Sequence, residues 1–177
     1  MHHVLRRYLF FFSLVFIPVF LTAQQEPATN PVHRPPILVT TAIIEVYDQG
    51  DFKGIVLIER GKAPFGIAIP GGKVEYGETV ENAVRREMME EVHLPLNDLR
   101  QFHVYSDPTR DFRHHSVEVT YTAKAFQFPV AGDDAAEAFV VKLEDIPWSE
   151  IVFDHAQVLK DYLEWRNGNQ SLAMPKP

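Results

Sequence analysis

Apolar and polar positions along the chain predict a sheet covered by two helices. Runs of β-branched and aromatic residues, bounded by turn residues, indicate strands at 39–47, 54–59, 67–69, 99–105, 117–125 and 138–143. Asp48–Asp51 favours a hairpin between the first two. Helical spacing follows Thr79, an expected N-cap, and returns from Asp154 to Asn167, with Gly168 as a stop. Two helices far apart in sequence can cover both faces of a sheet, so the expected fold class is α/β, with a mixed sheet inside a sandwich.

The N-terminal segment has a different pattern from the fold. Two arginines precede an uncharged apolar run that ends at Ala23, after which polar residues and prolines follow. This order predicts a secretory signal peptide at residues 1–23, and hence a periplasmic or secreted protein. An uncleaved membrane anchor is the alternative, because the run is only slightly shorter than the roughly 20 residues of a spanning helix. We expect a linker at 24–36, the folded domain at 37–168 and a tail at 169–177.

The first predicted helix carries acids on its apolar side. Its apolar stripe consists of Val80, Ala83, Val84 and Met88. At about 100° per residue, Glu87 and Glu91 fall within this stripe, and Glu90 lies at its edge beside Arg86. Carboxylates that face inward repel one another and lose hydration, so they must take up protons or bind a cation. Oxygen ligands of this kind suit Mg²⁺ or Mn²⁺. The alternative is a solvated acidic face with Arg86 paired to Glu90.

Composition narrows the class of partner. The 177 residues suit one domain, and an apolar fraction of 46% is enough for a core. Because the net charge is −7 and the basic residues are scattered, a nucleic-acid surface is not expected. The chain has no cysteine, which excludes disulfides, thiolate zinc sites and cysteine nucleophiles. A polyanionic substrate would therefore meet local charge and a metal ion.

The acidic helix and the glycine turn before it resemble the signature of the Nudix hydrolases, G-x5-E-x7-R-E-U-x-E-E-x-G-U, where U is a bulky apolar residue. In this chain Gly72 is followed by five residues and Glu78, then by seven residues and the run 86–94, REMMEEVHL. Every fixed position matches except the final glycine, which is His93. The resemblance covers about residues 37–167, and it implies the family's α/β/α sandwich.

The resemblance also implies roles for residues of the motif. The family's metal-binding carboxylates align with Glu87, Glu90 and Glu91. The carbonyl of Gly71 would be a further ligand, and Arg86 would orient one of the acids through its planar fork of donors. Gly72 would allow close approach of the loop, and Glu78 would favour the helix start. A left-handed residue at His93 would cost about 1 kcal/mol at the helix end.

The implied reaction is hydrolysis of a diphosphate with a bound divalent cation. In this interpretation the catalytic residues are Glu87, Glu91 and Arg86, with a general base that varies within the family. The best candidate for the base is Glu137, which opens the last strand, although it has the features of an exposed acid after a turn. Weaker candidates are Asp133 and Asp134.

Three further segments, 106–111, 131–135 and 153–155, resemble the ADP-ribose pyrophosphatase branch of the family. Arg110 or Arg113 is expected to clamp a phosphate, and Phe112 or Tyr105 to stack on adenine, with core packing as the alternative for each aromatic. The resemblance implies hydrolysis of ADP-ribose to AMP and ribose 5-phosphate. A nucleoside triphosphate pyrophosphatase and a non-catalytic ADP-ribose sensor are the alternatives.

Expected partners are few. The nucleotide is a small-molecule substrate, and a membrane is expected to matter only if the N-terminal segment stays uncleaved. The long apolar run Val39–Tyr47, interpreted as an edge strand, would permit a homodimer.

Overall fold

The computed structural model describes residues 34–132 and 135–168. Its strands are β1 (Ile37–Asp48), β2 (Asp51–Arg60), β3 (Ile67–Ala68), β4 (Gly71–Lys73), β5 (Asn97–Tyr105), β6 (Ser116–Ala125) and β7 (Ala135–Val141). Its helices are α1 (Val80–Glu91), a 3₁₀ turn η1 (Leu143–Asp145) and α2 (His155–Arg166). The predicted α/β sandwich with a mixed sheet is confirmed, and β4 and η1 were not expected.

The sheet is built around β1. The order is β3-β2-β1-β6-β5, with β4 also paired to β1 and β7 paired to β2. β6 runs parallel to β1 from Ile37 to Val46, whereas β2 and β4 pair with it antiparallel. The interpretation of Val39–Tyr47 as an edge strand is therefore wrong. The strand is apolar along its length because it lies inside the sheet, and the proposed route to a homodimer through its edge is closed.

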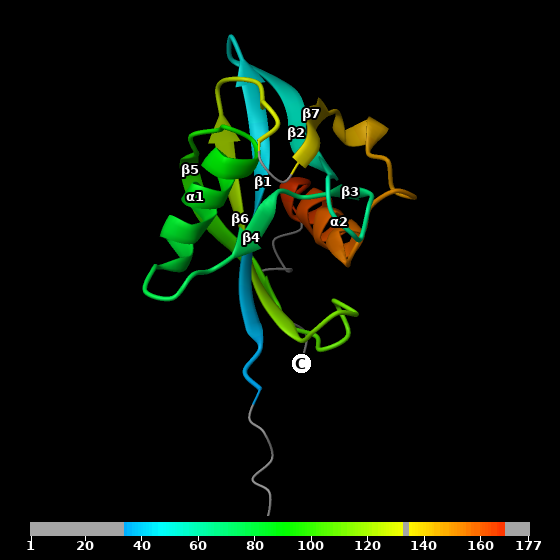
Figure 1. Ribbon diagram of the computed structural model, residues 1–177. Helices are drawn as coiled ribbons and strands as arrows, with labels where there is room; N and C mark the ends of the chain where they lie inside the picture. Colours follow the sequence, from blue (N-terminus) through cyan, green and yellow to red (C-terminus); the bar gives the residue numbers. More distant parts are fainter. Residues whose placement is uncertain (1–33, 133–134, 169–177) are drawn as a thin grey trace, which may run out of the picture. The chain divides into compact units, whose positions relative to one another are not determined.

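Two apolar cores lie on the two faces of the sheet, each under one helix (Figure 1). Ala42 and Ile44 of β1 face α1 and pack with Val84 and Met88. Ile43, one position along, belongs to the second core under α2. This alternation follows from the two-residue period of a strand, and it explains why β1 has so few polar positions.

Both α1 and α2 begin where the sequence predicts, directly after Thr79 and Asp154. The Thr79 hydroxyl accepts the Asn82 N–H at 3.2 Å, and α1 starts at the next residue. Asp154 occupies the N-cap position of α2 but makes no capping hydrogen bond, because its carboxylate pairs with Arg110. Gly168 follows α2 with φ of 90°. Of the helices in the described residues, none is both long and apolar enough to cross a membrane. The predicted signal segment lies outside the described residues.

Candidate functional site

A cleft of about 1030 Å³ opens between the start of β4, the inner face of α1, the loop 106–115 and the start of α2. One wall is acidic and carries the helix glutamates Glu87, Glu90 and Glu91. The other wall carries Arg110, Asp111, Arg113, Glu118, Phe153 and His155. Residues from elements and loops that lie far apart in sequence thus meet in one place.

The acidic wall is held by close contact between α1 and the turn at Gly71–Gly72. Glu91 is only 8% exposed, and its Oε2 accepts the Gly71 N–H at 2.8 Å. At Gly72, an added Cβ atom would overlap the Glu87 carboxylate, so a side chain there would displace Glu87. The turn and the helix therefore fix both carboxylates at the cleft.

Arg86 joins the acids of this wall into one group. Its Nη1 donates to Glu87 at 2.9 Å and to Glu90 at 3.0 Å, and its Nη2 donates to Glu78 at 2.7 Å. Nη2 also donates to the Lys73 carbonyl at 3.0 Å. The hydrogen bond with Glu78, followed by those with the other two acids, raises the pKa of Arg86. We call Arg86, Glu78, Glu87 and Glu90 the Arg86 cluster. One guanidinium faces three carboxylates, which leaves the cluster negative.

The acidic wall fits a divalent cation. Burial raises the pKa of Glu87, and the opposing hydrogen bond from Arg86 does not fully offset it. The negative charge of Glu87 is thus only partly stabilised by Arg86, and a bound cation would stabilise it further. The donors offered by Glu87, Glu90 and Glu91 are carboxylate oxygens, which Mg²⁺ and Mn²⁺ prefer. The hydrogen bond to Glu91 uses the N–H of Gly71, and the role of the Gly71 carbonyl as a ligand stays a prediction.

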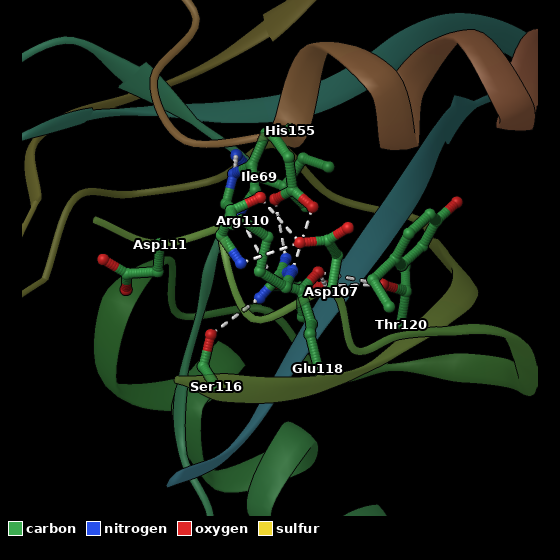
Figure 2. A network of polar contacts seen from close by, with 12 residues as sticks. Ile69, Asp107, Arg110, Asp111, Ser116, Glu118, Thr120 and His155 are labelled. Atoms are coloured by element: carbon green, nitrogen blue, oxygen red, sulfur yellow. Dashed lines mark hydrogen bonds and ion pairs between the residues drawn. The ribbon is translucent and has the colours of Figure 1, made fainter. Parts of the chain in front are cut away.

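The second wall contains a buried ionic network (Figure 2). The Arg110 side chain is 5% exposed and donates to Glu118 at 2.6 Å and to Asp154 at 2.7 and 2.9 Å. Its remaining terminal nitrogen donates to the Ser116 hydroxyl at 3.0 Å. We call Arg110, Glu118, Asp154 and His155 the Arg110 cluster. Arg110 lines the cleft, but four of its five N–H donors already bind protein acceptors.

Glu118 lies at the centre of this cluster. Burial would raise its pKa, but contacts with His155, Arg110 and Thr41 hold the pKa of Glu118 well below its usual range. Thr41 and Thr120 donate to one carboxylate oxygen at 2.7 and 2.9 Å, and Arg110 donates to the other. Glu118 is therefore a buried anion with both oxygens occupied.

His155 connects the cluster to the segment that leads into the turn at Gly71–Gly72. Its Nδ1 accepts the Ile69 N–H at 3.0 Å, and its Nε2 lies 3.6 Å from Glu118. Single ligand atoms of Glu118, Asp154 and His155 lie within 4.8 Å of one another, a spacing that a metal ion would accept. The Arg110 guanidinium already fills the place of that cation, so this group serves as an internal ion pair.

The sequence and fold can now be set beside known proteins. A family model described as NUDIX domain matches residues 36–165. The chain belongs to the Nudix family. An ADP-ribose pyrophosphatase of Methanocaldococcus jannaschii is 43% identical over 117 residues, which cover 64% of this chain and 68% of that protein.

Solved Nudix structures have the same fold. A MutT/nudix family protein from Enterococcus faecalis matches with a TM-score of 0.64 and 26% identity, over 81% of this chain and 66% of that chain. The NUDIX domain of Shewanella oneidensis NrtR, solved with ADP ribose, matches with a TM-score of 0.68 and 24% identity, over 76% and 90% of the two chains. At that identity the second likeness concerns the fold alone.

The departure from the Nudix motif at His93 has a local explanation. His93 adopts φ of 53°, the left-handed conformation that the motif glycine would favour. Its Nδ1 lies 3.1 Å from the Val130 carbonyl, and the Gly132 N–H donates to the Glu91 carbonyl at 2.8 Å. The loop 126–132 thus caps the end of α1, and the His93 ring contributes a contact that glycine would lack.

Two of the expected substrate-binding residues, Phe112 and Arg113, lie on the loop 106–115, but only Arg113 lines the cleft. Arg113 lines the cleft and forms a bidentate pair with Asp111, at 2.9 and 2.7 Å. Phe112 is 82% exposed and is not among the residues that line the cleft. Arg113 is therefore better placed than Phe112 to meet a substrate.

Other expected residues lie away from the cleft. Tyr105 donates to Asp161 of α2 at 3.0 Å, and burial, with the charge of Asp161, raises its pKa. Glu137 is exposed on β7, opposite Glu59 of β2. Neither is among the residues that line the cleft, so their roles in stacking and in proton transfer stay predictions. Asp133 and Asp134 lie outside the described residues.

Glu118 and His155 were not expected in the site. Glu118 occupies a polar position of the alternating pattern in β6, which suggested solvent, although that face is buried. His155 belongs to a segment noted only for its family resemblance. The sequence contained one sign that Glu118 is buried. Thr120 and Thr122, which follow it on the same face of β6, are uncharged, as suits a covered face.

Proposed function

We propose that this Nudix protein hydrolyses ADP-ribose to AMP and ribose 5-phosphate, with Mg²⁺ or Mn²⁺ bound at the acidic wall. The observation that carries the proposal is the 43% identity, over 117 residues, to an archaeal protein named ADP-ribose pyrophosphatase. The cleft supports it, because an acidic wall for a cation faces a wall that carries Arg113. The two walls suit the two parts of a metal-bound diphosphate.

Each wall has its own part in the reaction. Glu87, Glu90 and Glu91 would hold the cation, and Arg86 keeps Glu87 and Glu90 in place. A divalent cation at such a site neutralises diphosphate charge and favours deprotonation of the attacking water. The water oxygen forms a bond to one phosphorus while the bridging P–O bond breaks.

The proton of the water needs an acceptor within the cleft. Glu118 is unsuitable, because its lowered pKa and its occupied oxygens make it a weak base. Glu137 lies outside the cleft lining. We therefore propose that one of the α1 glutamates, Glu87 or Glu91, accepts the proton.

A substrate panel tests the proposed function. Purified full-length protein is assayed with ADP-ribose, other nucleoside diphosphate derivatives and nucleoside triphosphates, each with Mg²⁺ and with Mn²⁺. We expect ADP-ribose to give the highest kcat/KM, with AMP and ribose 5-phosphate in equal amounts. A strong preference for a triphosphate would select the alternative pyrophosphatase, and binding of ADP-ribose without turnover would select the sensor.

We also propose that the protein is exported through residues 1–23, with a membrane anchor as the alternative. The order of charged, apolar and polar residues supports this proposal. N-terminal sequencing of the mature protein tests it. A new N-terminus after Ala23 is expected, and an intact Met1 would exclude cleavage.

A further inference from the structure

The loop 106–115 folds so that Arg110 points inward. Asp107 Oδ1 accepts the N–H and the hydroxyl of Thr109 at 2.7 and 2.6 Å, and the Asp107 carbonyl accepts the Arg110 N–H at 3.1 Å. These bonds form a tight turn just before Arg110. Figure 2 shows the Arg110 side chain between Glu118 and the start of α2, and this side chain is 5% exposed.

Arg110 ties this loop to β6, the strand that follows it, and to the start of α2, which is distant in sequence. It bonds Glu118 of β6 and, 44 residues away, Asp154 at the start of α2. All three of its guanidinium nitrogens donate to protein acceptors. With 5% of its side chain exposed and four of its five N–H donors bound to protein acceptors, Arg110 is mostly committed to internal contacts. Arg110 therefore supports the second wall of the cleft from inside.

A second contact holds the loop 106–115 against Phe153, the residue just before Asp154. The Arg113 guanidinium carbon lies 4.8 Å from the centre of the Phe153 ring. Phe153 has φ of 59°, an unusual conformation for an aromatic residue. Its neighbours hold it there, since the Val152 N–H donates to the Ile67 carbonyl at 2.9 Å and Asp154 binds Arg110.

The same segment connects to the acidic wall. His155 follows Asp154 directly and accepts the N–H of Ile69. Ile69 lies two residues before Gly71, whose N–H donates to Glu91 at 2.8 Å. Hydrogen bonds therefore run from the loop 106–115 through the start of α2 to the turn that carries the metal site.

We propose that Arg110 is a positioning residue, which sets the loop 106–115 at a fixed place relative to the acidic wall. Arg113 is then the cation of this loop that meets the anionic substrate, while Arg110 acts through the loop. This inference rests on the proposed function, because it concerns substrate binding at the same cleft. It replaces the expectation that Arg110 clamps a phosphate directly.

The test uses full-length Arg110→Lys, which keeps the charge but loses the planar fork. Arg100→Lys is the matched control: Arg100 also donates twice to a carboxylate, that of Asp98, and does not line the cleft. Three quantities are measured: kcat and KM for the panel substrate that wild type hydrolyses fastest, the Kd of Mn²⁺, and hydrogen exchange by mass spectrometry.

For Arg110→Lys we expect KM to rise about tenfold or more while kcat changes by less than about threefold, since the loop binds substrate and the cation site remains. The Kd of Mn²⁺ should stay within about twofold of wild type, and amides of residues 107–115 should exchange faster than in Arg100→Lys. An unchanged KM, or faster exchange spread over α1 and the sheet, would overturn the proposal.

A second variant and a readout that does not need activity distinguish failure of this proposal from failure of the proposed function. If Arg110→Lys does not fold, Asp154→Asn removes one partner of Arg110 and retains Glu118, and the same expectations apply to it. If wild type hydrolyses nothing in the panel, the proposed function fails. The exchange of residues 107–115 still decides whether Arg110 positions the loop, because local acceleration supports that role and unchanged exchange refutes it.

Discussion

Two arginines organise the two walls of the cleft, and they do so in different surroundings. The Arg86 side chain is 27% exposed and faces three carboxylates of α1 and the segment before it. The Arg110 side chain is 5% exposed and faces two carboxylates, from β6 and the start of α2. The first cluster is accessible and local in sequence, whereas the second is buried and assembled from distant parts of the chain.

The Arg86 cluster and the Arg110 cluster differ in how far their negative charges are compensated, and this difference separates their roles. The Arg86 cluster has an excess of negative charge, and Glu91 adds to it at the same wall. Such a group still needs a cation, which is what a functional metal site requires. The Arg110 cluster supplies its own cation and occupies both oxygens of Glu118. A buried cluster that contains its own cation and whose oxygens are hydrogen-bonded holds structure, and removal of one partner is costly.

The largest effect is expected from Glu118→Gln. The change leaves the buried Arg110 with Asp154 as its one remaining carboxylate partner, so we expect the free energy of unfolding to fall by about 3–5 kcal/mol. Urea denaturation at pH 7 measures it. Glu164→Gln, on the exposed side of α2, is the control and should lie within about 0.5 kcal/mol of wild type. A loss below about 1 kcal/mol for Glu118→Gln would contradict a structural role for the cluster.

The same variant predicts a change in pH dependence. The pKa of Glu118 is lowered in the folded protein from its ordinary value of 4.5. A group of this kind stabilises the fold above its unfolded pKa, and the stabilisation is lost as the pH falls below it. Wild type should therefore lose stability below about pH 4.5 more steeply than Glu118→Gln. Parallel curves of unfolding free energy against pH would show that Glu118 does not titrate in this way.

Glu91→Gln tests the acidic wall, where we expect the opposite result, a loss of activity without a large loss of stability. The amide keeps an acceptor for the Gly71 N–H but loses the charge that a cation needs. We expect turnover to fall about 100-fold or more and the Kd of Mn²⁺ to rise, with little change in unfolding free energy of the metal-free protein. Kinetics, Mn²⁺ titration and denaturation measure the three quantities. If activity survives while stability falls, the assignment of the two walls is reversed.

Arg86→Lys should give a smaller loss at the same wall. Lysine offers a point charge in place of a fork that bonds Glu78, Glu87 and Glu90 together. Supporting residues of metal sites typically contribute 10–100-fold, so we expect metal affinity to weaken by about tenfold. Mn²⁺ titration measures it, and addition of excess Mn²⁺ should recover much of the activity. Failure of excess metal to restore turnover would indicate a direct role for Arg86.

These differences also explain what sequence reasoning can find. The acids of α1 lie on one helix, so the period of 3.6 residues places them on one face without any knowledge of the tertiary structure. The Arg110 cluster depends on strand pairing, since Thr41 and Glu118 meet only because β1 and β6 run parallel. Nothing in the local pattern of either strand indicates that register.

The errors have similar causes. Val39–Tyr47 was interpreted as an edge strand, although a nearly continuous apolar run is typical of a strand covered on both faces. β4 was missed because its three residues, Gly-Gly-Lys, have low strand propensity and pair with β1 through the backbone. The helices, the α/β class and most strands were predictable because hydrophobic period and capping residues determine them locally.

The smallest effect is expected from His93→Gly, which restores the glycine of the motif. Glycine relieves the left-handed strain of about 1 kcal/mol but loses the contact with Val130, of comparable size. We expect unfolding free energy and Mn²⁺ affinity close to wild type. His93→Ala is the informative partner, because it loses the contact and keeps the strain, and it should be less stable than His93→Gly by about 1 kcal/mol. Equal stability of the two variants would mean that the strain at this position is negligible, and that the end of α1 is held by the loop 126–132 alone.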